Sequence, residues 1–133
     1  MKNTYLEETK VLQLQFEKRG GLLPVVVQDV SSKAVLMLGY ANQEAIKQSF
    51  TSGYATFWST SRKALWTKGA TSGDRLKIAE IQVDCDQDAV LYLVHMEGKG
   101  ACHTQNPQGI TRFSCFYRKI EDISDETLGF FTQ

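Results

Sequence analysis

The sequence lacks the features that would direct it to a membrane, to the secretory pathway or to nucleic acid. No apolar run approaches the roughly 20 residues of a transmembrane helix. The opening residues, MKNTYLEETK, lack the apolar stretch of a signal peptide. Fifteen basic residues balance fifteen acidic ones, so broad electrostatic attraction to nucleic acid or anionic lipid is not supported. We therefore expect a cytoplasmic protein without a nucleic-acid or membrane partner.

Cysteine is scarce: the chain has three, and no two of them have C-x-x-C spacing. An odd number of cysteines without a signal peptide argues against a disulfide framework. The three residues are then reduced thiols, which either lie scattered in the core or bind a metal. Composition alone favours the core.

Repeats, low-complexity tracts and interdomain linkers are also absent, and 133 residues suit one domain, residues 1–133. Asn42 as N-cap and Gly53 as C′ residue predict a helix over 43–52. The apolar spacing of residues 5–18 predicts a second, short amphipathic helix.

The remaining apolar pattern is that of strands. The expected fold is α+β, predominantly antiparallel β with one or two short helices. Strands are predicted at 25–27 and 34–38 (a hairpin), 54–58, 76–83 with a slip at Ala79–Glu80, 89–96 and 113–117.

The densest chemistry lies in the run Asp84-Cys85-Asp86-Gln87-Asp88, between two expected strands. On an extended backbone the three carboxylates share one face and Cys85 points to the other. Such carboxylates repel one another unless a cation lies among them, and oxygen ligands suit Mg²⁺. An acidic, solvated turn explains the same run equally well.

Cys85 would then serve a softer metal, and its only possible thiol partners are Cys102 and Cys115. Three thiolates with one open position fit a catalytic Zn²⁺, because structural sites usually close with four protein ligands. Such an ion turns water into a nucleophile near neutral pH. His103, beside Cys102, is a fourth ligand, the base that handles the proton, or simply a loop residue.

Residues 58–75, WSTSRKALWTKGATSGDR, form a polar loop suited to a phosphorylated substrate. Its glycines let the backbone approach an anion closely, and its hydroxyl and basic side chains can donate to phosphate oxygens. Trp58 and Trp66 can stack on a base. A solvated loop with two half-buried tryptophans is an equally good reading of this composition.

Together these segments resemble the phosphoribosyl-AMP cyclohydrolase family. The blocks W-x-K-G-x-T-S-G, D-C-D-x-D and A-C-H-T are jointly very specific. The matching segments follow the family's order through most of the chain: VVVQDVSSKAVLMLGYANQEA, ATFWSTSRKALWTKGATSGD, VDCDQDA, GACHT and SCFYR.

The resemblance implies hydrolysis of the N1–C6 bond of phosphoribosyl-AMP in histidine biosynthesis, by an intertwined homodimer with metal sites at the subunit interface. It implies one catalytic Zn²⁺ per subunit on Cys85, Cys102 and Cys115, drawn from both chains. It implies Mg²⁺ on Asp84, Asp86 and Asp88. We assign proton transfer to His103. The expected substrate contacts are Trp58, Arg62, Trp66, Lys68, Thr71 and Ser72.

The interval HTQNPQGITRFS between Cys102 and Cys115 is longer than the family's short form, and Pro107 and Gly109 predict that the extra residues bulge outward. About fifteen residues follow Arg118, too few for the pyrophosphatase domain fused to some members. Two alternatives remain. One is a zinc nucleobase deaminase, whose H-x-E and P-C-x-x-C signature is missing. The other is a non-catalytic module in which zinc staples a nucleotide-binding dimer.

Overall fold

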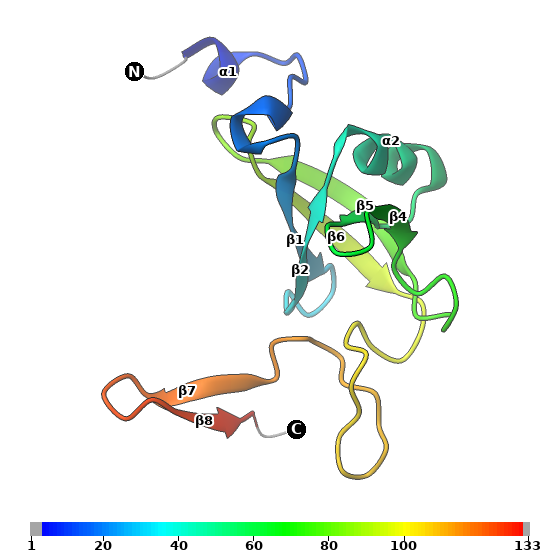
Figure 1. Cartoon of the computed structure of the whole chain (residues 1–133), viewed down its shortest axis with the longest axis vertical. Coiled ribbons are helices and arrows are strands. Elements are labelled where there is room, and N and C mark those ends of the chain that lie inside the picture. The colour runs from blue at the N-terminus through cyan, green and yellow to red at the C-terminus, as the bar shows by residue number, and fades with distance from the viewer. Residues whose placement is uncertain (1–3, 132–133) are drawn as a thin grey trace.

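A four-stranded sheet forms the centre of the structure, a computed structural model that describes residues 4–131 (Figure 1). The outer strand pairs are antiparallel, whereas the central pair, β1 and β6, is parallel. The chain is therefore α+β and mostly antiparallel, as predicted. The strands, in the order β2-β1-β6-β5, are β2 (Val35–Ala41), β1 (Leu23–Asp29), β6 (Val90–Met96) and β5 (Leu76–Val83).

The β1–β2 hairpin forms where the sequence predicts it. The Asp29 carboxylate accepts hydrogen bonds from the Ser32 backbone N–H and hydroxyl, both at 2.8 Å, which closes the turn. The predicted slip in β5 is also present, as a register shift between Ile78 and Glu80. Such a bulge lets the strand keep its apolar residues on the buried face.

Helix α2 (Gln43–Ser52) also follows the prediction. The Asn42 side chain accepts a hydrogen bond from the Ala45 N–H at 2.8 Å, and Gly53 ends the helix with φ 79°. The helix lies beside a small sheet of β3 (Thr56–Ser59) and β4 (Ala64–Thr67). Strand β4 corrects the prediction of a loop over 58–75. It forms because Trp66 packs on the buried Phe57 ring, with centroids 5.1 Å apart.

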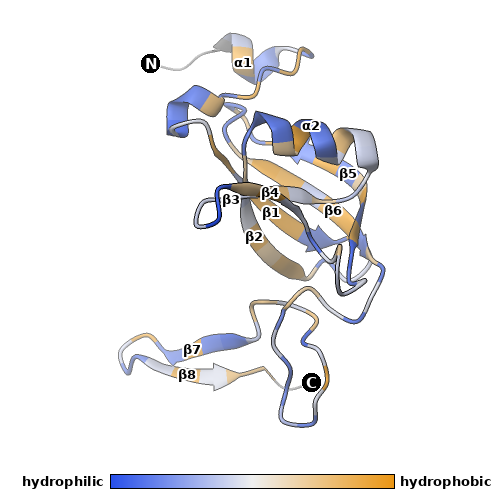
Figure 2. Cartoon of the chain, turned by 45° about the vertical axis from the view of Figure 1, so that its right-hand side comes forward, coloured by the Kyte–Doolittle hydropathy of each residue, from blue (hydrophilic) through white to orange (hydrophobic). Residues whose placement is uncertain are grey.

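The core lies between the central sheet, α2 and β3, and Figure 2 shows that much of the central strands is hydrophobic. Each alternate residue of β1 is buried, as one-sided strands require. Among residues 4–131, no helix is both long and apolar enough to span a membrane. The largest fully buried side chains include Tyr92, Phe57, Leu23, Leu36 and Leu76.

The predicted helix over 5–18 is wrong. A short helix α1 (Thr4–Glu8) and a 3-10 turn η1 (Phe16–Arg19) flank an irregular segment. The Gln13 N–H donates to the Gln87 side chain at 2.7 Å, and the Gln15 N–H donates to the Gln87 carbonyl at 2.8 Å. These bonds to the β5–β6 turn take backbone donors that a continuous helix would use internally.

The predicted strand over 113–117 is wrong as well. The Arg112 carbonyl accepts a hydrogen bond from the Cys102 N–H, and the Phe113 carbonyl accepts one from the Ala101 N–H. Two residues later, the Cys115 N–H donates to the Leu36 carbonyl of β2 at 2.7 Å. The segment therefore bonds first to one part of the chain and then to another, and it does not pair with a single strand. The chain then forms an unpredicted hairpin, β7 (Arg118–Asp122) with β8 (Thr127–Phe130). This hairpin extends away from the central sheet (Figure 1).

Candidate active site

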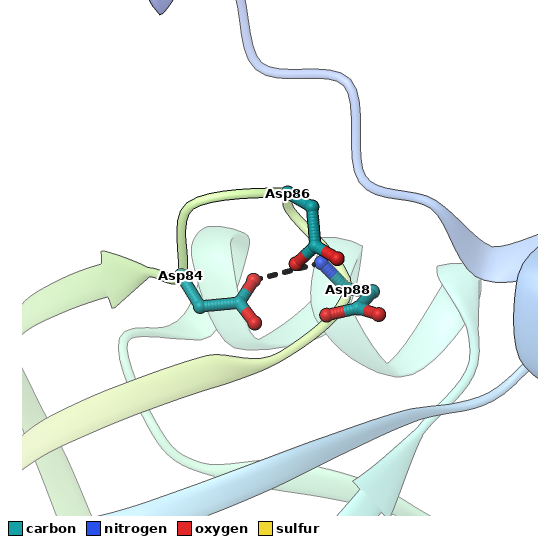
Figure 3. Close-up of side chains that lie close together, drawn as sticks. All are labelled: Asp84, Asp86 and Asp88. Carbon is teal, nitrogen blue, oxygen red and sulfur yellow. Dashed lines mark hydrogen bonds between the residues drawn. The ribbon is translucent and has the colours of Figure 1, made fainter. Parts of the chain in front are cut away.

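The three aspartates gather on a tight turn between β5 and β6 (Figure 3). Their carboxylate oxygens lie within 4.8 Å of one another. The extended backbone that was predicted here is wrong: Gln87 has φ 56°, and Asp84 accepts hydrogen bonds from the Asp88 and Ala89 N–H groups at 2.9 and 3.1 Å. The turn nevertheless collects a donor set of oxygens alone, which suits a hard divalent cation.

Two cationic side chains from η1 approach this acidic cluster. The Lys18 ammonium lies 2.8 Å from Asp86 Oδ2 and 2.9 Å from Asp88 Oδ2. Arg19 Nη2 lies 3.1 Å from the same Asp88 oxygen. The hydrogen bond from Lys18 holds the pKa of Asp88 well below its ordinary value, whereas partial burial raises the pKa of Asp84.

Cys102 and Cys115 come together at the other end of β6. The 102–115 interval doubles back on itself, since Cys102 donates to the Arg112 carbonyl at 3.2 Å and Arg112 donates to the Thr104 carbonyl at 3.1 Å. Cys115 is tied to β2 by its bond to Leu36. The longer interval therefore folds as a bulging loop, as predicted, and leaves the two thiols as neighbours that influence each other's pKa.

The environments of the two thiols differ. Burial would raise the pKa of Cys102, but hydrogen bonds from the hydroxyl and N–H of Thr104 outweigh it, and the pKa lies below its ordinary value. Although Cys115 is exposed as a residue, burial around its sulfur, together with the Cys102 sulfur, raises its pKa to about 11. Lys68 is close enough to oppose that increase.

Cys85 does not join this pair within one chain. It lies on the β5–β6 turn, before β6 begins, whereas Cys102 follows the end of β6. The seven residues of β6 separate the two ends by roughly 20 Å at the usual rise of a strand. Ligands of one zinc ion lie within a few ångströms of each other, so a single chain cannot place all three sulfurs on one ion.

The glycine-rich part of the predicted loop, between β4 and β5, borders a surface hollow of about 630 Å³. Arg75 reaches Glu97 at 3.3 Å and lies over the Tyr54 ring at 4.3 Å, so one wall carries a guanidinium paired with a carboxylate. An open hollow with hydroxyls, backbone N–H groups and a guanidinium fits a phosphate group. Its polar lining includes Thr67, Thr71, Ser72, Arg75 and Glu97.

The other predicted site residues are more dispersed. Trp58 and Trp66 are half-buried on β3 and β4, and Trp66 packs on Phe57. Arg62 is exposed on the turn between these strands, where its N–H donates to the Ser59 hydroxyl at 3.2 Å. His103 is exposed directly after the buried Cys102. The structure thus places His103 and Lys68 near the thiol pair, and Thr71 and Ser72 at the hollow.

Sequence reasoning missed four residues that support these sites. Lys18 and Arg19 contact the aspartates, while Arg112 donates to Thr104 Oγ1 at 3.1 Å, which in turn lies 2.9 Å from the Cys102 sulfur. Thr104 had a signal, because it ends the A-C-H-T block. The others had none, since their contacts depend on how the chain folds.

Comparison with known proteins gives a consistent result. The family model described as phosphoribosyl-AMP cyclohydrolase matches residues 37–117. A phosphoribosyl-AMP cyclohydrolase of Archaeoglobus fulgidus is 54% identical over 110 residues, which cover 83% of this chain and 94% of that protein. One from Solibacter usitatus is 49% identical over 83% of this chain and 82% of that protein. A histidine biosynthesis bifunctional protein of Aquifex aeolicus is 46% identical over 84% of this chain and 51% of its own length.

Proposed function

The chain belongs to the phosphoribosyl-AMP cyclohydrolase family, and we propose that it hydrolyses the N1–C6 bond of phosphoribosyl-AMP, a step of histidine biosynthesis. The observation that carries this proposal is that the loop which doubles back from Cys102 brings Cys115 close to it, inside the matched residues 37–117. The product is the ring-opened formimino carboxamide ribotide.

The thiol pair fits a zinc ion. Thiolates are preferred ligands of Zn²⁺, and Cys102 already has hydrogen bonds that favour its thiolate form. We assign the third ligand to Cys85 of the partner subunit, because Cys85 of the same chain lies beyond reach. When bound, Zn²⁺ supplies a Lewis acid that lowers the pKa of a water molecule to near neutrality.

A homodimer is supported by the isolated β7–β8 hairpin. Its strands pack chiefly on each other, and two-stranded hairpins alone are only marginally stable in water. Ile120, Leu128 and Phe130 are each more than half exposed. Exposed apolar side chains on a hairpin that extends from the central sheet are suited to pack against a second copy of the chain. The proposed shared zinc site also requires a second copy.

Water adds to C6 of the adenine ring, which is electrophilic because N1 carries a ribosyl group. The C6–N1 bond then breaks, N1 receives a proton and C6 becomes the carboxamide carbon. We assign the proton transfer to His103, whose exposed imidazole follows the ligand Cys102 and can exchange protons with solvent.

The phosphorylated ends of the substrate need cationic partners. We propose that the hollow beside Thr71, Ser72 and Arg75 receives one phosphate. Trp58, Arg62, Trp66 and Lys68 remain the other proposed substrate contacts. Asp84, Asp86 and Asp88 fit Mg²⁺ by their oxygen-only donor set, and this cation would neutralise phosphate charge.

The test is to add phosphoribosyl-AMP to zinc-loaded protein and follow the ultraviolet absorbance. Ring opening changes the chromophore, so a time-dependent spectral change is expected, and it should disappear in the variant Cys102→Ala. The matched control is Thr51→Val, on the exposed side of α2, which should react like the wild type. Binding without a spectral change would instead favour a zinc-stapled nucleotide-binding module. Release of ammonia would favour a deaminase.

A further inference from the structure

The acidic cluster carries its own counter-charges. Asp84, Asp86 and Asp88 bring three negative charges, and Lys18 and Arg19 bring two positive ones, which leaves one negative charge. Carboxylates this close repel each other. The two cations from η1 therefore offset most of the repulsion in the metal-free protein.

Of the two basic residues, Lys18 lies where it would compete more directly with a bound cation. Its ammonium donates to Asp86 at 2.8 Å and lies 2.9 Å from Asp88, so it bridges two of the three carboxylates. Within residues 4–131, Arg19 contacts only Asp88 of the three aspartates. A divalent cation shared by the three aspartates needs oxygens from both carboxylates that Lys18 now bridges.

The Lys18 side chain is exposed enough for its ammonium to move away from the aspartates into solvent. Half of its surface is exposed, whereas the Asp88 side chain is only 6% exposed. A long, half-exposed lysine can move its ammonium into water at small cost, whereas Asp84 is held by the Asp88 and Ala89 N–H groups and the Asp88 side chain is buried. Lys18 can therefore leave the cluster more easily than the carboxylates of Asp84 and Asp88 can.

We propose that the Lys18 ammonium is a built-in competitor at the aspartate site, and that a divalent cation binds there by displacing it. This inference rests on the metal assignment of the proposed function. Lys18 then sets the affinity of the site and keeps the metal-free cluster from repelling itself. Removing its positive charge should strengthen cation binding, because two like charges within a few ångströms repel each other even near the surface.

The test is a titration of zinc-saturated full-length protein with Mn²⁺, in which free Mn²⁺ is followed by electron paramagnetic resonance. We expect Lys18→Met to bind Mn²⁺ about tenfold more tightly than the wild type. Lys18→Gln should behave in the same way. The control Lys47→Met, an exposed lysine of α2, should match the wild type. Asp86→Asn should weaken binding and so identify the site.

Two results would overturn the inference, and they can be told apart. Equal or weaker Mn²⁺ binding by Lys18→Met, with binding still reduced in Asp86→Asn, would show that Lys18 does not compete and would leave the metal assignment standing. Undiminished binding by Asp86→Asn would remove the aspartate site itself, and with it both the inference and the proposed magnesium site.

Discussion

At the scale of the residue, Thr104 connects the thiol pair to the rest of the loop. Its hydroxyl oxygen accepts a hydrogen bond from Arg112 at 3.1 Å and lies 2.9 Å from the Cys102 sulfur. The single hydroxyl hydrogen is therefore available for the sulfur. Cys102 is a proposed zinc ligand, and partners of metal ligands fix ligand orientation, so we expect Thr104 to contribute to zinc affinity without touching the ion.

We predict that Thr104→Val, which keeps the side-chain shape and removes the hydroxyl, lowers zinc affinity by about tenfold. Competition with a chromophoric chelator measures this affinity. The control is Thr51→Val, whose hydroxyl donates to the Lys47 carbonyl on α2. Equal zinc affinities in the two variants would contradict the role given to Thr104.

Asp88 should make the free energy of unfolding of the metal-free protein depend on pH in the acid range. Its pKa is lower in the folded chain than its ordinary value of 3.8, chiefly because Lys18 donates to it. The folded state then binds this proton more weakly than the unfolded state does. This contribution of Asp88 to stability is therefore fully present at pH values well above 3.8, and it is lost as the pH falls through 3.8 toward the folded pKa.

We therefore expect Asp88→Asn to lower the free energy of unfolding at pH 7 by about 1–3 kcal/mol. Urea denaturation in the presence of a chelator measures it at pH 7 and again at pH 3. The difference between wild type and variant should be smaller at pH 3. A difference that grows on acidification would mean that the ion pairs with Lys18 and Arg19 do not lower this pKa.

Part of the aspartate cluster could be predicted from the sequence, and part could not. Their number and spacing were enough to predict a carboxylate cluster, because a short segment holds them together in any conformation that turns. Lys18 could not be predicted, since it lies 68 positions from Asp86 and reaches it only through the folded N-terminal segment. The three carboxylates do lie together as predicted, but a turn brings them together and not the extended backbone that the prediction assumed.

At the scale of the element, helices and strands were predicted correctly where residues close in sequence determine the structure. Helix α2 has its own cap and stop residues, and β5 has its own alternation, so both follow the prediction closely. Residues 5–18 have helical spacing as well, but hydrogen bonds to Gln87 displace the helix. Strand β7 is exposed throughout and thus offers no buried face for a pattern to reveal.

The β4–β5 loop provides an element-level prediction, because two of its glycines have positive φ but different surroundings. At Gly69, φ is 77° and a Cβ would overlap the Asp74 backbone, whereas at Gly73, φ is 84° and the space is open. Both alanine substitutions should cost about 1–2 kcal/mol for the left-handed backbone. Gly69→Ala should cost about 1–3 kcal/mol more from overpacking.

Urea denaturation of Gly69→Ala and Gly73→Ala measures this contrast directly. Because the same loop lines the proposed phosphate hollow, Gly69→Ala should also raise KM more than Gly73→Ala does. Equal effects on stability would indicate that the loop relaxes around the added methyl group, and that Asp74 does not hold it in place.

At the scale of the whole molecule, the proposed zinc site raises the question of how three thiols could reach one ion. Cys85 precedes strand β6 and Cys102 follows it, and β6 is an inner strand of the central sheet, paired with β1 on one side and with β5 on the other. No local movement closes a gap of roughly 20 Å along a strand. The proposed zinc site therefore needs a second copy, placed so that its Cys85 turn meets the Cys102–Cys115 loop of the first.

This arrangement makes a quantitative prediction for mixed dimers. Cys85→Ala and Cys102→Ala should each be inactive as homodimers. When the two variants are unfolded, mixed in equal amounts and refolded with zinc, half of the dimers are mixed at random. Each mixed dimer has one site with all three cysteines and one with two missing. The mixture should therefore recover about a quarter of wild-type activity, measured by absorbance.

The matched control is a mixture of Cys102→Ala with Cys115→Ala. Both variants lack a thiol of the same loop, so every site in their mixed dimers still lacks a ligand, and activity should stay at the background level. If zinc were held within one chain, neither mixture would recover activity. Recovery by the first mixture alone can arise only when Cys85 acts across the subunit boundary.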